Sequence, residues 1–555
     1  MGTAHPRGGH VHRHHVRRNP LSSSMNHAIT HDIVITGGRV IDGTGRPAER
    51  ADLAVTGDVI TAIGMGPYQA TTRIDATDRV VAPGFIDLHS HADFTVAGHP
   101  TAETAIAQGV TTLITGNCGQ STFPVRDQEE ARLSTAFRDF PLSWEWTDAA
   151  GFGETVMAAG PAVNVGLQVG HNALRVAVMG QQDRAPDTRE LREMCSLIEE
   201  SAQHPGVVGF STGLIYIPGL FAFTDELVAL VSAAASCDLL YSTHMRSETS
   251  ELVEAVEEAI GTAERSGARL EISHLKAMGP ENWGAVDKAL ELIDAARARG
   301  VDVAADVYPY TASSTDLSSR VPRWAIDGGR PALLDRLADP VQRARIAEEM
   351  RARFGRDIDP EGVVIADLPP GEFDSYVGWS IARIGRDRGV DAAEVALDVL
   401  AAHAGSVTIV NHAMSEDDVR TVLAHPWVSV ASDGWMLAPS GPGRPHPRSF
   451  GTFPRVLGRY VREQPTISLE EAIRKMTTLP ASRIGITDRG SLTVGAAADI
   501  VVLDPHSIAD TSTFDDPWQL ARGVHTVLVN GTPTLLDGEF TKNHAGRLLQ
   551  KRKPA

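Results

Sequence analysis

The chain has 555 residues, of which 42% are hydrophobic and 22% charged, and its formal net charge is −19. This length suits a large domain with insertions or two to three ordinary domains. An acidic balance argues against nucleic acid or an anionic membrane as the main partner, since both require clustered positive charge. No apolar run is long enough to span a bilayer, and three cysteines are too few for a disulfide framework in a chain of this size.

The first 24 residues differ in composition from the rest of the chain. They contain four Arg and five His, no acidic residue, and no apolar centre of the kind a secretory signal needs. We therefore expect residues 1–27 to be a disordered or tag-like leader. We also expect a cytoplasmic protein.

Short alternating segments separated by glycine-rich turns occur at both ends of the chain. They lie in residues 28–82, as in DIVITGG and ADLAVTGD, and in residues 486–548, as in AADIVVLDP and HTVLVNG. Such patterns are typical of β-strands. Because each group is too small to bury a core of its own, we expect the two to join in one β-sandwich domain.

Residues 83–485 alternate short apolar runs with helical patterns, for example over 251–267 and 282–300. Strands separated by helices predict an α/β fold with a parallel sheet, here a (β/α)8 TIM barrel. A barrel needs eight strands, so one candidate is an extra strand, and we expect it to be VTIVNH at 407–412 or a piece of an insertion. Residues 318–378, rich in Arg, Asp and Pro, predict an insertion near the barrel mouth. The nine strand candidates are PGFID, GVTTLITG, AVNVGLQVG, GVVGFSTGL, LLYSTH, RLEISH, VDVAADVYPY, VTIVNH and VSVASD.

Metal-competent side chains follow four of the predicted strands. The carboxyl ends of barrel strands form the active-site face, so these groups are expected to meet there. One histidine at such a position is more often a satisfied core residue, but four strands with this feature favour a shared metal site. Imidazole and carboxylate ligands with an occasional thiolate suit Zn²⁺, and Cys118 in GNCG is a candidate thiolate. The strand-end groups are His89 and His91 in HSH, His244, His274 and Asp433.

Nine motifs follow one another along residues 33–546: PGFIDLHSHAD, VTTLITGNCG, STGLIYIPG, STHMRSE, ISHLK, YPYTASSTD, ASDG, HPRSFGTFPRVL and AADIVVLDP. Together they resemble the N-acyl-D-amino-acid deacylases, or D-aminoacylases, of the amidohydrolase superfamily. HxH and AADIVVLDP are general to that superfamily, whereas GNCG and HPRSFGTFPRVL are specific to this branch. Other amidohydrolases bridge their metals with a carboxylated lysine, and the third and fourth strand candidates end in no convincing lysine.

The resemblance implies a role for individual residues. It implies one tight zinc site on Cys118, His244 and His274, and a second, weaker metal position on His89, His91 and Asp433. Asp433 would also be the catalytic group, which accepts a proton from the attacking water and passes it to the leaving nitrogen. The residues that would bind the substrate α-carboxylate are Tyr216, Lys276, Ser313 and Arg448, although the two cations could instead pair with neighbouring acids.

The function implied by the resemblance is hydrolysis of the amide bond of N-acyl-D-amino acids to a carboxylate and a free D-amino acid. The D configuration rests on the resemblance alone. The alternatives are a dipeptidase or cyclic-amide hydrolase on the same metal site, and a barrel that has lost catalysis and serves as a binding subunit.

Two further sets of residues bear on the substrate. Trp435, Met436 and Leu437 indicate an apolar pocket wall, so we expect neutral or hydrophobic side chains to be favoured. Arg320 and Arg323 could instead pair with an acidic side chain. His171 in VGHNALR could reach the site or hold a strand-to-helix turn, and it receives no role here.

Overall fold

The computed structural model describes residues 1–2, 30–134 and 142–551, so the predicted leader lies outside the described residues except for Met1 and Gly2. Eight parallel strands form a nearly closed barrel. Its first and last strands meet where Ser90 bridges Gly434 and the amide of Asp433 donates to the carbonyl of His89 over 2.8 Å. The barrel confirms the predicted α/β fold. In order around the sheet, the strands are β8 (Phe85–Asp87), β9 (Val110–Ile114), β10 (Asn164–Gly170), β11 (Val207–Gly213), β12 (Leu240–His244), β13 (Leu270–Ile272), β14 (Val303–Val307) and β18 (Val428–Val430).

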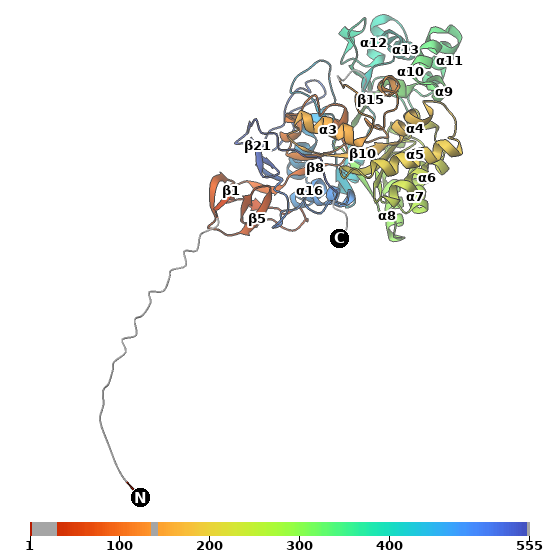
Figure 1. Cartoon of the computed structure of the whole chain (residues 1–555). Coiled ribbons are helices and arrows are strands. Elements are labelled where there is room, and N and C mark those ends of the chain that lie inside the picture. Colours follow the sequence, from red (N-terminus) through yellow and green to blue (C-terminus); the bar gives the residue numbers. More distant parts are fainter. Residues whose placement is uncertain (3–29, 135–141, 552–555) are drawn as a thin grey trace.

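Helices connect the strands, and α4 to α8 lie along one side of the barrel in Figure 1. The predicted helices over 251–267 and 282–300 are confirmed as α7 (Leu252–Ser266) and α8 (Ala285–Ala298). In α7 the apolar residues at helical spacing are buried, and the helix ends at Gly267, whose φ of 71° suits glycine. The other helices of this part are α1 (Glu103–Ile106), α2 (Gln128–Ser134), α3 (Ala149–Ala159), α4 (His171–Met179), α5 (Thr188–Ser201), α6 (Thr224–Ser236), α14 (Glu416–Ala424), α15 (Arg448–Arg455), α16 (Leu469–Met476) and α17 (Thr478–Arg483).

The ninth strand candidate lies outside the barrel, as predicted. It is β17 (Thr408–His412), which pairs antiparallel with β15 (Ala312–Asp316) and β16 (Val363–Asp367) in a separate three-stranded sheet. This sheet and five helices form an insertion between β14 and β18, with an apolar core of its own, at the top of Figure 1. The insertion expected over 318–378 lies inside this larger unit of residues 312–412. Its helices are α9 (Arg323–Ile326), α10 (Gly329–Ala338), α11 (Pro340–Arg351), α12 (Ile381–Arg388) and α13 (Ala392–Ala402).

Both ends of the chain build a β-sandwich, at the lower left of Figure 1. β7 and β19 pair antiparallel, with Val81 opposite Val502, and buried apolar residues of both chain ends share one core. The predicted sandwich is therefore confirmed. One sheet contains β5 (Val59–Gly64), β4 (Asp52–Thr56), β1 (Thr30–Thr36) and β6 (Gln69–Asp75). The other contains β22 (Glu539–Phe540), β21 (Thr532–Leu536), β20 (Val524–Val529), β19 (Ile500–Leu503), β7 (Val80–Pro83), β2 (Arg39–Val40) and β3 (Glu49–Arg50).

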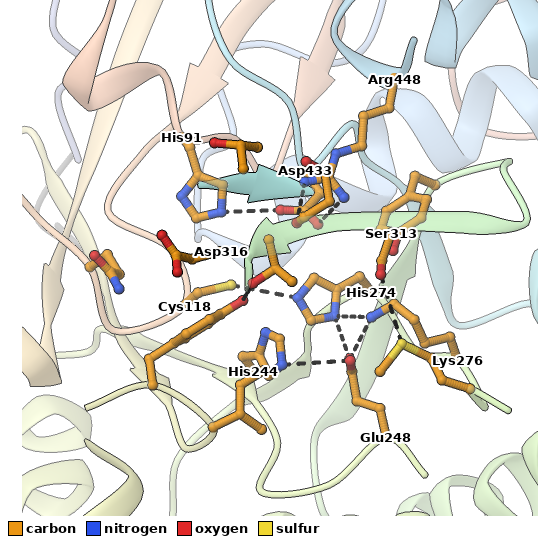
Figure 2. Close-up of a pocket in the computed structure, with 18 of the residues that line it drawn as sticks. His91, Cys118, His244, Glu248, His274, Lys276, Ser313, Asp316, Asp433 and Arg448 are labelled. Carbon is orange, nitrogen blue, oxygen red and sulfur yellow. Dashed lines mark hydrogen bonds and ion pairs between the residues drawn. The ribbon is translucent and has the colours of Figure 1, made fainter. Parts of the chain in front are cut away.

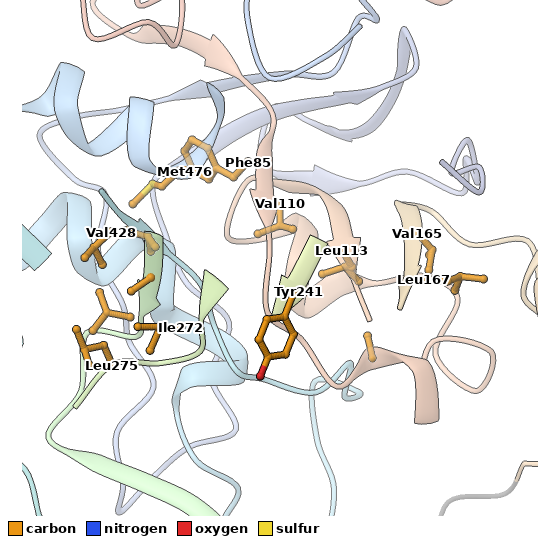
Figure 3. Close-up of a cluster of buried hydrophobic side chains, with 14 of the residues drawn as sticks. Phe85, Val110, Leu113, Val165, Leu167, Tyr241, Ile272, Leu275, Val428 and Met476 are labelled. Atoms are coloured by element: carbon orange, nitrogen blue, oxygen red, sulfur yellow. The ribbon is translucent and has the colours of Figure 1, made fainter. Parts of the chain in front are cut away.

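The main apolar core lies in and around the barrel. Figure 3 shows part of it, where side chains of β8, β9, β10, β12, β13 and β18 gather, including Phe85, Val110 and Ile272. Burial of such side chains stabilises the fold by about 1.5–3 kcal/mol each. This rigid core holds the strand ends in place. Within the described part of the chain, no helix combines the length and apolar character needed to cross a lipid bilayer.

Candidate active site

Figure 2 shows five of the six predicted metal ligands gathered at the carboxyl ends of the barrel strands: His91, Cys118, His244, His274 and Asp433. The six form two groups that share one cysteine. The ligand atoms within each group lie within 4.8 Å of one another, and every member is buried. These distances define a potential metal-binding site. The first group is Cys118, His244 and His274, and the second is His89, His91, Cys118 and Asp433.

Cys118 reaches the site from a tight turn after β9. Its φ is 56°, in the left-handed region that few side chains adopt. Its carbonyl also packs against Gly213 at the end of β11, where an added Cβ would lie 1.9 Å from the Cys118 oxygen. The turn therefore needs a glycine at the end of β11, two strands away in the barrel, and it directs the sulfur inward, 3.3 Å from His89 Nε2 and 3.5 Å from His274 Nε2. Burial raises the pKa of the Cys118 thiol, but His89 and His274 together hold it well below its usual value.

Asp433 follows β18 and faces the histidines of the first strand. Its Oδ1 atom lies 3.1 Å from His91 Nε2 and 3.4 Å from His89 Nε2, and its Oδ2 atom lies 2.7 Å from Arg448 Nη1. Burial raises the pKa of this carboxyl, yet Arg448 and the two histidines hold it well below its usual range. Asp433 is therefore a buried carboxylate.

Two acids that sequence reasoning missed contact the candidate ligand histidines. Asp306 of β14 lies 3.3 Å from His89 Nδ1 and accepts a hydrogen bond of 2.8 Å from the amide of His274. Glu248 lies 3.0 Å from His274 Nδ1 and 3.5 Å from His244 Nε2. A signal for each was present in the sequence. Asp306 is an acid inside the apolar run VDVAADV, and Glu248 follows a candidate ligand by four residues.

The four residues expected to bind the substrate α-carboxylate all line one pocket together with every metal-competent residue except His89. Both cations among them are ion-paired, as the alternative interpretation of the sequence allowed. Lys276 Nζ contacts Glu248 Oε1 and lies 2.8 Å from His274 Nδ1, and Arg448 pairs with Asp433. The Tyr216 hydroxyl lies 3.5 Å from Thr315 Oγ1, and the Ser313 hydroxyl faces Met278 Sδ at 3.8 Å.

The insertion supplies one wall of this pocket. Arg320 is only 6% exposed, and no described residue forms an ion pair with it; burial and the neighbouring Arg353 lower its pKa to about 10. Arg323 lies outside the described lining, half-exposed and paired with Asp183. The lining residues from the insertion are Ser313, Ser314, Thr315, Asp316, Arg320 and Thr408.

Trp435 lines the pocket, whereas Met436 and Leu437 are not among the described lining residues. Tyr308 and Gln120 also line it, although the sequence interpretation gave them no role. His171 begins α4, and its Nε2 lies 2.9 Å from Glu226, outside the described lining. This position matches the strand-to-helix turn that was one of its two possible roles.

Comparison with known proteins agrees with this architecture. A family model described as an amidohydrolase family matches residues 72–535. The chain is 37% identical to N-acyl-D-glutamate deacylase of Alcaligenes xylosoxydans xylosoxydans, over 94% of this chain and 96% of that relative. It is also 37% identical to D-aminoacylase of the same organism, over 94% and 98% of the two chains. The fold is also similar to the crystal structure of N-acyl-D-glutamate deacylase from Bordetella bronchiseptica, with a TM-score of 0.81 and 35% sequence identity, over 94% of this chain and 100% of that one. That structure contains zinc and a phosphonate inhibitor that mimics the tetrahedral intermediate of the reaction. The chain belongs to the amidohydrolase family and, within it, to the branch of the D-aminoacylases.

Proposed function

We propose that this protein hydrolyses the amide bond of N-acyl-D-amino acids in a zinc-dependent reaction, releasing a carboxylate and a free D-amino acid. One observation carries the proposal. The pocket that is lined by every metal-competent residue except His89 is also lined by two cations and two hydroxyls, the chemistry that a substrate α-carboxylate requires. The relatives named above act on N-acyl-D-amino acids, which supports the same substrate class here.

The donor set fits zinc. Cys118, His244 and His274 offer one thiolate and two imidazoles, and catalytic zinc sites have three protein ligands and an open position. The Nδ1 atom of His244 is buried and makes no hydrogen bond with any described residue, so a metal would satisfy it. His89, His91 and Asp433 would hold a second, weaker ion.

Zinc bound to these residues would supply a Lewis acid that activates water and stabilises the developing oxyanion. Asp433 supplies the base. Because Arg448 holds its carboxylate ionised, Asp433 can accept the proton of the attacking water and then deliver it to the leaving nitrogen. Asp433 is buried, and the low dielectric around it strengthens its interactions with Arg448, His89 and His91.

The α-carboxylate of the substrate would bind between Arg448, Lys276 and the hydroxyls of Tyr216 and Ser313. The Nε atom of Arg448 is buried and has no hydrogen-bond partner among the described residues, so a donor is available for an anion. A charge-assisted hydrogen bond to such a donor contributes about 1.5–3 kcal/mol. This contact would align the scissile amide with Asp433.

We propose a preference for neutral or hydrophobic side chains, since Ile215, Met278 and Trp435 line the pocket. A preference for acidic side chains is the competing possibility, and one observation favours it. Arg320 is a buried cation at the pocket wall without an ion-pair partner in the described chain, and an acidic substrate would provide one.

A panel of N-acetyl-D- and N-acetyl-L-amino acids tests the proposal, with zinc-loaded protein and detection of the released amino acid. We expect turnover of D substrates with leucine or methionine side chains and no turnover of their L enantiomers. Faster turnover of N-acetyl-D-glutamate or N-acetyl-D-aspartate would assign the role of Arg320 and reject the apolar preference. Hydrolysis confined to dipeptides or cyclic amides would reject the proposed reaction.

A further inference from the structure

Glu248 occupies a central position behind the first metal-competent group. It lies four residues after His244, beyond the end of β12, and it is only 4% exposed. Figure 2 shows its carboxylate between the two histidines and Lys276. Its Oε1 atom contacts His274 Nδ1 at 3.0 Å and Lys276 Nζ, and its Oε2 atom lies 3.5 Å from His244 Nε2.

The contact with His274 selects which nitrogen of that ring faces the metal position. In His274 the Nε2 atom faces Cys118 Sγ at 3.5 Å, while the Nδ1 atom faces Glu248. In His244 the Nε2 atom lies at an ion-pair distance of 3.5 Å from Glu248 Oε2, and neither ring nitrogen makes a hydrogen bond with a described residue. A carboxylate only accepts hydrogen bonds, so it holds the ring proton on the nitrogen that it contacts and leaves the other lone pair free.

Lys276 makes this carboxylate necessary. Its ammonium lies 2.8 Å from His274 Nδ1, and an ammonium can only donate hydrogen bonds. Without Glu248, Lys276 would donate to Nδ1, and the ring proton would then lie on Nε2, the nitrogen that faces Cys118. That tautomer cannot bind a metal through Nε2. Glu248 prevents it by accepting hydrogen bonds from both the Nδ1–H of His274 and the Lys276 ammonium.

We propose that Glu248 is the positioning residue of the tight zinc site, which it maintains by setting the tautomer of His274, by its ion-pair contact with His244 and by neutralising Lys276. The inference rests on the metal site of the proposed function and not on its substrate. Second-sphere partners of this kind typically change metal affinity by about 10- to 100-fold when they are replaced.

The chain offers a matched control. Glu226 is also buried, and it also lies between a histidine and a cation, 2.9 Å from His171 Nε2 and 2.6 Å from Arg175 Nη1, but it is not among the described lining residues of the pocket. Glu226→Gln and Glu248→Gln therefore remove the same kind of interaction at two places. Only Glu248 lies next to the metal-competent group of Cys118, His244 and His274.

The experiment measures zinc affinity by competition with a chromophoric chelator, with circular dichroism and thermal unfolding of the zinc-free proteins as folding controls. We expect Glu248→Gln to lose about 10- to 100-fold in affinity and Glu226→Gln to stay within about threefold of the wild type. In Glu248→Gln/Lys276→Met the competing ammonium is absent, so part of the loss should be recovered. This double variant also contains no unpaired buried ammonium, so it serves as the test if the single variant does not fold.

Three outcomes would overturn the proposal: wild-type affinity in folded Glu248→Gln, equal losses in both glutamine variants, or no recovery in the double variant. Evidence against the proposed deacylase function would come from a different measurement. A wild-type protein that binds zinc tightly but releases no D-amino acid would reject the deacylase function, while the affinities of the variants would still decide the role of Glu248.

Discussion

The role of Arg448 in binding the α-carboxylate can be separated from its role beside Asp433. Arg448→Gln removes the guanidinium from both groups at once. The loss next to Asp433, whose Oδ2 lies 2.7 Å from Nη1, would affect every substrate, because the proposed base acts on all of them. The loss of the carboxylate contact affects only substrates with a free α-carboxylate.

The magnitude follows from Nε, which makes no hydrogen bond with any described residue; Nη1 makes none either, but it is ion-paired with Asp433. One charge-assisted hydrogen bond contributes about 1.5–3 kcal/mol. At about 1.4 kcal/mol per tenfold change in rate, this corresponds to about a 10- to 150-fold loss. We therefore expect the ratio of kcat/KM for N-acetyl-D-leucine to that for its α-amide to fall by this factor in Arg448→Gln.

The assay follows release of acetate from both substrates with zinc-loaded protein. Arg175→Gln is the control, since Arg175 is also buried and paired with a glutamate but is not among the described lining residues of the pocket. It should leave the ratio unchanged even if it lowers stability. An unchanged ratio in Arg448→Gln, with both rates reduced alike, would refute the carboxylate contact and restrict Arg448 to its ion pair with Asp433.

Three further predictions concern the metal site and stability. Asp433→Asn should lower kcat by about 10²- to 10⁴-fold at saturating substrate in metal-loaded protein, and a near-wild-type kcat would exclude Asp433 as the proton acceptor. Cys118→Ala should lose zinc on dialysis, as measured by elemental analysis, whereas stoichiometric zinc in the variant would place the thiolate outside the ligand set. Glu190 belongs to the capping box of α5, where Arg184 and the Asp187 amide lower its pKa from 4.5 to about 2. The contribution of the ionised carboxylate to the stability of the fold is therefore complete above pH 4.5 and is lost as the pH falls towards 2. Glu190→Gln keeps a capping-box acceptor but loses the charge that pairs with Arg184, so it should cost about 0.5–1 kcal/mol at pH 7. Its difference in Tm from the wild type should shrink below pH 4.5, and a difference independent of pH would contradict this linkage.

Sequence reasoning was most successful where a single rule connects residue order to position in space. The carboxyl ends of barrel strands share one face, so His89, His244, His274 and Asp433 could be placed together without knowledge of any distance. The surplus ninth strand could be recognised for the same reason, because a closed barrel accepts eight. The start of the insertion at Ala312 could not, since β15 lies within a motif that continues directly from the barrel strand before it.

Contacts between individual side chains could not be predicted from the sequence. That Glu248 lies between two histidines and Lys276 depends on the path of the loop after β12 and on the rotation of two imidazole rings. The pairing of Arg448 with Asp433 depends in the same way on how α15 approaches β18. A residue pattern indicates which chemistry is available, but these details decide which donor is already occupied.

The closure of the barrel between its first and last strands has a consequence for the order of folding. His91 and Asp433 approach to 3.1 Å although 342 positions separate them along the chain. Contacts of such large sequence separation form late, because the entropy of the intervening loop must first be lost. The group of Cys118, His244 and His274 spans only β9 to β13 and can assemble in an open sheet, whereas the group that includes Asp433 requires the completed ring. Metal binding at the first group would therefore precede metal binding at the second during refolding. The first event would report assembly of β9 to β13, and the second would report closure of the barrel.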